Sequence, residues 1–201
     1  MDSLWQQTAA SLRDQTASES ATPGGGSVAC VTGALGLGLV LMALRITANK
    51  TPSELLQRLT ERGSALMAGV SAGADADVAA FDSYMSALRL PKGTDAERAT
   101  RKQKLSEAAT EATRVPLAAA DTMIAGLELA VQALPNVAHV VASDVFAGAD
   151  LLAGAVAAVM RSVDINLSSI DDGAEAESLR QGRLARSARA TALHHDLLRA
   201  R

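Results

Sequence analysis

The sequence is poor in aromatic residues and in cysteine. Only 2% of its 201 residues are aromatic although 48% are apolar, so small and unbranched side chains must fill the interior. Such residues favour closely packed helices, whereas β-sheets use β-branched and aromatic residues. Cys30 is the single cysteine, which excludes an intrachain disulfide and metal sites built on paired cysteines. We therefore predict an all-α protein, without a bound metal, in a reducing cytoplasm.

The sequence also lacks an excess of basic charge. It has 19 lysines and arginines against 22 acidic residues, a net charge of −3, which gives no general attraction to nucleic acid or anionic membranes. The first residues, 1–14, do not show the basic start and apolar run of a secretory signal. We expect neither nucleic-acid binding nor export.

Long linkers are missing as well. A chain of this length can bury roughly 70% of its unfolded surface around one core, and each predicted break between helices is only a few residues long. We predict a single domain over residues 1–201.

One long segment has no charged residue, from Gly24 to Leu44. It could span a membrane, and its glycines Gly33, Gly36 and Gly38 would suit helix contacts within lipid. However, no basic cluster precedes it, and the later segments are amphipathic. We therefore favour a central buried helix, without membrane association.

The remaining pattern predicts a bundle of six or seven helices. A first amphipathic helix over 2–17 should cover the bundle, and Ser27 and Ser143 should cap two apolar helices. Thr94 to Glu97 has the form of a capping box, and Pro116 should kink or split the helical stretch that follows. The predicted segments are 2–17, 27–47, 54–88, 94–134, 144–163 and a last helix after 171–173.

Several motifs occur in an order that resembles one known family. Thr22-Pro23-Gly24-Gly25-Gly26-Ser27-Val28-Ala29 with Gly33-Ala34-Leu35-Gly36 is similar to the opening of the cyclodeaminase/cyclohydrolase family. The later matches, which cover nearly the whole chain, are residues 75–81, 90–94, 115–117, Ser143-Asp144 and 166–171. That family includes formiminotetrahydrofolate cyclodeaminase and a bacterial methenyltetrahydrofolate cyclohydrolase.

The resemblance implies a helical homodimer that binds a tetrahydrofolate derivative near the subunit interface, without a metal or redox cofactor. We expect a cyclohydrolase that converts 5,10-methenyltetrahydrofolate to formyltetrahydrofolate, because the sequence shows no formiminotransferase domain. Two alternatives stay open: a cyclodeaminase that releases ammonia from formiminotetrahydrofolate, and a folate-binding or scaffold homologue without catalysis.

The glycine loop is the first candidate binding element. Gly24, Gly25 and Gly26 would let the backbone approach a ligand, and the free N–H groups of a helix that begins at Ser27 could bind the glutamate tail of folate. The alternative is a tight turn that only serves helix packing.

Two aspartates are the candidate catalytic residues. Asp77 lies one helical turn from Phe81, so a carboxylate and an aromatic ring would share one face and could hold or deprotonate a ligand. Asp144 follows Ser143 at a helix start, where an ionised carboxylate could stabilise a cationic substrate. Either aspartate could instead be a solvated acid or a helix cap.

Asn166 and Lys92 complete the candidate binding residues. Asn166 offers both a donor and an acceptor to a heterocycle, or it only ends a helix. Lys92 could pair with a folate carboxylate, although most exposed turn lysines do not. Arginines at every third position from Arg180 to Arg189 indicate a solvated face rather than an anion site.

The sequence also departs from the family pattern. Val137-Ala138 stand where the family has Gly-Asn, and Ser162 stands where it has an earlier Asn. These differences indicate that the substrate or the activity has diverged.

Overall fold

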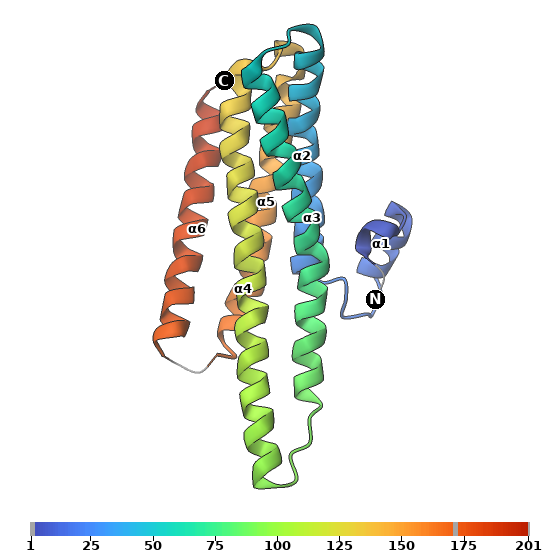
Figure 1. Cartoon of the computed structure of the whole chain (residues 1–201), viewed down its shortest axis with the longest axis vertical. Coiled ribbons are helices and arrows are strands. Elements are labelled where there is room, and N and C mark those ends of the chain that lie inside the picture. The colour runs from blue at the N-terminus through green and yellow to red at the C-terminus, as the bar shows by residue number, and fades with distance from the viewer. Residues whose placement is uncertain (1–2, 171–172, 201) are drawn as a thin grey trace.

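A computed structural model describes residues 3–170 and 173–200. Within these ranges the chain forms six α-helices and three short 3-10 helices, and Figure 1 shows the long helices side by side in an elongated bundle. The prediction of an all-α domain with six or seven helices is confirmed. The elements are η1 (Leu4–Gln6), α1 (Ala9–Thr16), α2 (Gly25–Lys50), α3 (Glu54–Leu88), α4 (Asp95–Ala133), η2 (Leu134–Asn136), η3 (His139–Val141), α5 (Ala142–Leu167) and α6 (Ala174–Arg199).

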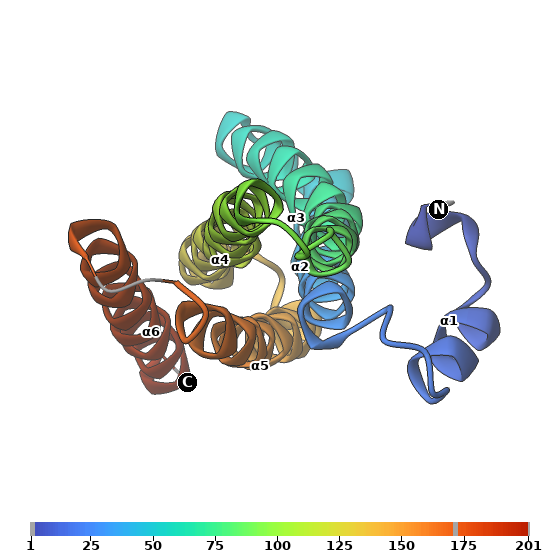
Figure 2. The same cartoon turned by 90° about the horizontal axis from the view of Figure 1, so that it is seen from below.

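The core lies among α2, α3, α4 and α5. Helix α2 packs along α3 and α5, α4 closes the other side, and α6 lies outside against α4 and α5 (Figure 2). Leu37, Val40 and Leu44 of α2 are completely buried. Their burial explains why this segment carries no charge, because an unpaired charge in such a core would be costly.

Glycines allow the backbones of α2 and α5 to touch. A Cβ atom on Gly36 would lie 2.8 Å from the Gly148 carbonyl oxygen, and one on Gly148 would lie 2.5 Å from the Gly36 carbonyl oxygen. Both distances are too short for any larger residue, so this contact requires glycine on each helix.

The outer side of α2 is not covered by its own chain. Leu35 is 61% exposed and Met42 is 38% exposed. By length and composition alone, three segments could cross a membrane: Gly25–Lys50, Asp95–Asn136 and His139–Leu167. In the bundle they pack against one another, which accounts for much of their apolar character.

The N-terminal segment differs from the single covering helix predicted over 2–17. The Thr8 side chain accepts a hydrogen bond from the Ser11 N–H and starts α1 afresh after η1. Asp75 of α3 holds η1 by accepting hydrogen bonds from the Ser3 hydroxyl (2.6 Å) and the Leu4 N–H (2.9 Å). Helix α1 fully buries no residue, although Leu12 is partly buried against the core, and its ribbon lies to one side of the long helices (Figures 1 and 2).

Two predicted helix caps are wrong. Helix α2 begins after Gly24, whose carbonyl accepts from the Val28 N–H, and the Ser27 hydroxyl donates back to that same carbonyl at 3.0 Å. Helix α5 begins after Val141, without a side-chain cap, because the preceding 3-10 turn leads directly into it. Ser143 therefore lies inside the first turn. The capping box of Thr94 and Glu97 is confirmed.

Pro116 does not split α4, which runs unbroken from Asp95 to Ala133. Proline has no N–H, so the Ala112 carbonyl loses its usual partner four residues later. The Asn166 side-chain amide of α5 donates to this carbonyl at 2.6 Å. A side chain from the neighbouring helix thus replaces the missing backbone bond.

The arginines of α6 do not form the solvated face predicted from their spacing. Arg183 makes a two-point contact with Asp164 of α5, and Arg186 makes another with Asp121 of α4. Arg189 pairs with Glu128. These ion pairs join α6 to the bundle.

Candidate active site

A pocket of about 400 Å³ opens where the start of α2 meets the end of α5. Five elements line it: the loop before α2, α2 itself, α3, α4 and α5. The structure here brings together six predicted site residues, namely Gly24, Gly25, Gly26, Asp77, Phe81 and Asn166. Ser27, also predicted, is completely buried directly behind the glycines.

Asp77 lies in α3 with its carboxylate against the first turn of α2. Burial raises the pKa of this carboxyl above its ordinary value of 3.8. The Ser27 backbone N–H favours the ionised form, and offsets only part of that rise. A partly buried carboxyl with a raised pKa in a pocket is suited to accept a proton from a ligand or from water.

Cys30 of α2 lies one turn after Gly26 and is more deeply buried than Asp77. The pKa of the Cys30 thiol is raised to about 12, mainly by burial and to a lesser extent by the nearby charge of Asp77. The thiol therefore stays protonated at neutral pH and supplies no thiolate nucleophile. This leaves Asp77 as the proton acceptor on this side of the pocket.

The three glycines of the loop have different surroundings. A Cβ atom on Gly26 would lie 2.2 Å from Oδ1 of Asp77, whereas a Cβ atom on Gly25 would meet nothing within 4 Å. None of the described glycines has a positive φ. Gly26 is therefore required by the Asp77 carboxylate rather than by backbone strain, and Gly25 leaves open space at the pocket wall.

The pocket collects aromatic side chains from a chain that has few of them. Phe81 and Tyr84 both line it, although the whole sequence has two phenylalanines, one tyrosine and one tryptophan. Tyr84 was not among the residues predicted from the sequence, yet it lies seven residues after Asp77, a spacing that places both on one face of a helix. The two rings form a surface on which a planar heterocycle can stack.

The end of α5 supplies polar groups to the same pocket. The Asn166 side-chain N–H group is used by the Ala112 carbonyl, so its Oδ1 remains as an acceptor. Ser162, noted in the sequence only as a departure from the family pattern, also lines the pocket. Together they offer an acceptor and a hydroxyl in the pocket that the two aromatic side chains line.

Lys92 is exposed and lies outside this pocket. It lines a neighbouring hollow of about 390 Å³ at the turn between α3 and α4. Ser169 lines both cavities, so the two spaces adjoin.

Ser143 and Asp144 lie at the opposite end of the bundle. The Ala138 N–H donates to Oγ1 of Thr47, which joins the segment before η3 and α5 to the end of α2. Along α5, Asp144 lies about 33 Å from Asn166 at a rise of 1.5 Å per residue. A single chain therefore does not bring Asp144 and Asp77 to one site.

The histidines have no arrangement that suggests a metal. His194 pairs with Asp150 at 2.6 Å, and His139 and His195 are exposed. Among the described residues, no group of three or more His, Cys, Asp or Glu side chains is placed to hold a metal ion.

Comparison with known proteins supports the resemblance seen in the motifs. The profile of the Formiminotransferase-cyclodeaminase family matches residues 8–184. A methenyltetrahydrofolate cyclohydrolase from Methylorubrum extorquens is 34% identical over 85% of this chain and 84% of its own length. Formimidoyltransferase-cyclodeaminase from Sus scrofa is 35% identical over 83% of this chain, which spans only 32% of that protein.

The fold has a counterpart among solved structures. The crystal structure of formiminotetrahydrofolate cyclodeaminase from Thermotoga maritima superposes with a TM-score of 0.85, covering 96% of this chain and 95% of that one, at 23% identity. The ordered motifs, the matched profile and this fold agree, and the chain belongs to the formiminotransferase-cyclodeaminase family.

Proposed function

We propose that this protein is a methenyltetrahydrofolate cyclohydrolase. The observation that carries the proposal is the partly buried Asp77 carboxyl, with its raised pKa, in a pocket lined by Phe81 and Tyr84. The similarity to the Methylorubrum extorquens cyclohydrolase, over most of both chains, supports the same reaction.

The proposed reaction needs only water and a group that moves a proton. Water adds to the cationic carbon between the two folate nitrogens, and the Asp77 carboxylate accepts the proton that the water loses. That proton passes to one of the two nitrogens, whose bond to the carbon then breaks. As the bond breaks, the hydroxyl of the adduct loses its own proton to the Asp77 carboxylate and from there to solvent, and its oxygen becomes the carbonyl of the formyl group on the other nitrogen. Asn166 Oδ1 and the Ser162 hydroxyl are placed to orient the heterocycle or the water.

The cyclodeaminase reaction is the second candidate. It is supported by the similarity to the Sus scrofa protein and by the fold shared with the Thermotoga maritima enzyme. In that reaction a nitrogen of the folate attacks the formimino carbon, and ammonia leaves with a proton. The same Asp77 could transfer this proton, so the pocket is compatible with both substrates.

We further propose that the protein is a homodimer with each site completed by the partner. Helices α2 and α5 expose several apolar side chains to solvent, among them Leu35, Met42, Leu151 and Ile165. Ile165 also lines the pocket. A two-fold pairing of these antiparallel helices would cover the apolar surface and bring Asp144 of the partner toward the Asp77 pocket.

The proposal includes a cytoplasmic location and no metal or redox cofactor. Its chemistry is supported by the proton-transfer route above, and the location by the reduced, buried Cys30.

A direct assay tests the function. Purified protein is mixed with methenyltetrahydrofolate and, separately, with formiminotetrahydrofolate, and methenyl absorbance is followed. Loss of absorbance faster than in the buffer blank identifies the cyclohydrolase, whereas gain of absorbance from the formimino compound identifies the cyclodeaminase. If neither changes while folate still binds, the protein is a binding homologue.

A further inference from the structure

The N-terminus of α2 is occupied by a carboxylate of the protein itself. Asp77 Oδ1 lies only 2.2 Å from the position that a Cβ atom of Gly26 would take, and the Ser27 N–H stabilises the charge of this carboxylate. A helix N-terminus attracts anions through its few free N–H groups. Because Asp77 already uses this position, a carboxylate of the ligand would meet a like charge here.

The pocket has a direction along α3. Asp77, Phe81 and Tyr84 follow one another on one face of the helix, which continues to Leu88. Asp77 and Leu88 are separated by about 16 Å at 1.5 Å per residue. In Figure 1 the turn that follows, between α3 and α4, extends beyond the start of α2. A long ligand with its heterocycle at Asp77 would therefore reach this turn.

The hollow at that turn is positively charged although the protein is acidic overall. Its lining includes Lys92, Arg98, Arg101 and Lys102, whereas the whole chain has a net charge of −3. It adjoins the site pocket at Ser169. Such a local concentration of cations favours an anionic group.

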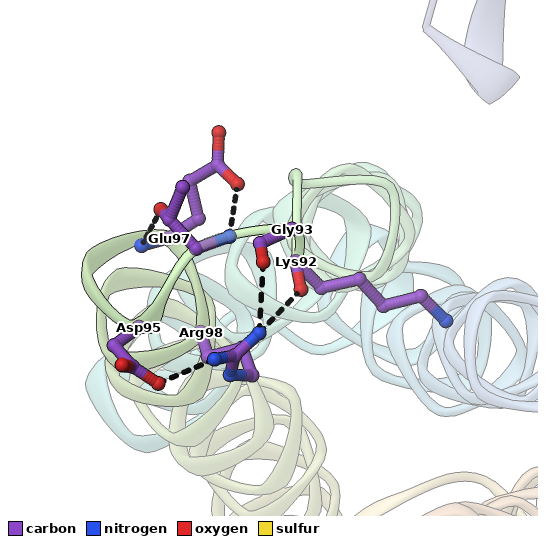
Figure 3. Close-up of polar contacts among 6 residues, drawn as sticks. Lys92, Gly93, Asp95, Glu97 and Arg98 are labelled. Atoms are coloured by element: carbon purple, nitrogen blue, oxygen red, sulfur yellow. Dashed lines mark hydrogen bonds and ion pairs between the residues drawn. The ribbon is translucent and has the colours of Figure 1, made fainter.

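The cations of the hollow have different contacts. Arg98 is held by Asp95 and by the carbonyls of Lys92 and Gly93, as Figure 3 shows. Arg101 donates to the Leu88 carbonyl at 3.2 Å. Because a carbonyl is neutral, this contact does not compensate the positive charge of Arg101. The Lys92 side chain extends away from Asp95 and Glu97 in Figure 3. Lys92 and Arg101 are therefore the two cations best placed to bind a ligand.

We propose that the folate lies along α3, with its pterin ring at Asp77 and its glutamate carboxylates in the basic hollow, bound by Lys92 and Arg101. The inference rests on the proposed function. The sequence offered two candidates for the glutamate tail, the α2 N-terminus and Lys92, and the proposal assigns the tail to the Lys92 side and not to the α2 N-terminus.

Binding of two ligands tests the orientation. The ligands are 5-formyltetrahydrofolate and its analogue without the glutamate, measured by calorimetry against the wild type, Lys92→Met and Arg101→Met. Each substitution should weaken binding of the complete folate about tenfold, the effect of one charge-assisted contact, and leave the analogue unchanged. Thermal melts show whether Arg101→Met, which loses a contact to Leu88, is still folded.

Lys104→Met is the matched control, because it removes the same charge from α4 but from a lysine that pairs with Glu107 outside the hollow. Its affinity for the complete folate should change less than twofold. Equal affinities of the wild type for the two ligands, or equal effects of all three substitutions, would overturn the tail site alone. If the wild type bound neither ligand, the proposed function itself would fail.

Discussion

The two ends of the bundle carry the two candidate aspartates in opposite settings. Asp77 is largely enclosed, fitted against Gly26, and opens to an aromatic pocket. Asp144 lies in the first turn of α5, partly exposed, at the end where Thr47 of α2 contacts the segment before α5. The Asp77 end thus already forms a pocket within one chain. The Asp144 end offers a charged side chain that could act on a ligand only together with a surface from a second chain.

The largest effect should follow from removing the enclosed carboxylate. Asp77→Asn should lower turnover about 1000-fold, since general acid–base groups contribute on that order, while the fold survives. Turnover is measured by methenyl absorbance. Asp82→Asn, an exposed acid on the same helix, is the control and should keep near-normal turnover. A fully active Asp77→Asn would move the proton transfer elsewhere.

If both ends of the bundle serve one site, Asp144 also contributes to turnover. Asp144→Asn should lower turnover about 100-fold by removing a charge that stabilises the cationic transition state. Mixing inactive Asp77→Asn and Asp144→Asn chains, with exchange of subunits, should restore about a quarter of wild-type activity if each two-fold dimer site uses both subunits. A mixture that stays inactive would mean that the two aspartates do not act across the interface.

Two glycines at the Asp77 end, Gly26 and Gly25, should respond differently to substitution. Gly26→Ala places a methyl group on the Asp77 carboxylate and should reduce turnover roughly tenfold or more, because small displacements of reacting groups are costly. Gly25→Ala meets open space, so its melting temperature should match the wild type. Equal turnover of the two variants would show that the fit between Gly26 and Asp77 is unimportant.

The raised pKa of Asp77 predicts a pH dependence of stability. The folded-state pKa lies above 3.8, so the contribution of this carboxyl is complete below about pH 4 and is lost as pH rises through the folded-state pKa. Asp77→Asn has no such loss. The melting temperature of Asp77→Asn, relative to that of the wild type, should therefore increase as the pH is raised from 4 to 7. A constant difference over this range would contradict the burial of an ionisable group.

The smallest effect concerns Asn166 and Pro116. Asn166→Ala leaves the Ala112 carbonyl without its donor and should cost about 1–2 kcal/mol of unfolding free energy. In a Pro116→Ala background, where a backbone N–H returns, the same substitution should cost less. Urea denaturation of the four chains of this cycle measures the coupling. Purely additive costs would show that the two residues are independent.

Much of the Asp77 end could be predicted from the sequence. The glycine loop, Asp77, Phe81 and Asn166 were expected to bind one ligand, and the structure brings them to one pocket. Tyr84 was missed although its spacing from Asp77 indicates the same helix face.

Other features depend on contacts that local patterns do not contain. Ser27 and Ser143 have suitable side chains for caps, but the backbone of the preceding residues starts each helix earlier. The separation of Asp144 from Asp77 follows from the direction of α5 along α2. The ion pairs of Arg183 and Arg186 depend on acids more than 15 residues away.

The contact between Gly36 and Gly148 has a consequence for the spacing of the two ends. Because the backbones of α2 and α5 meet there without side chains between them, neither helix can slide along the other by a turn, about 5.4 Å, without bulkier residues colliding. The contact between the two glycines therefore fixes the position of α5 along α2, and with it the distance between Asp77 and Asp144. In a two-fold dimer the same distance would determine how far the subunits overlap, so a substitution in mid-bundle would misalign both sites at once.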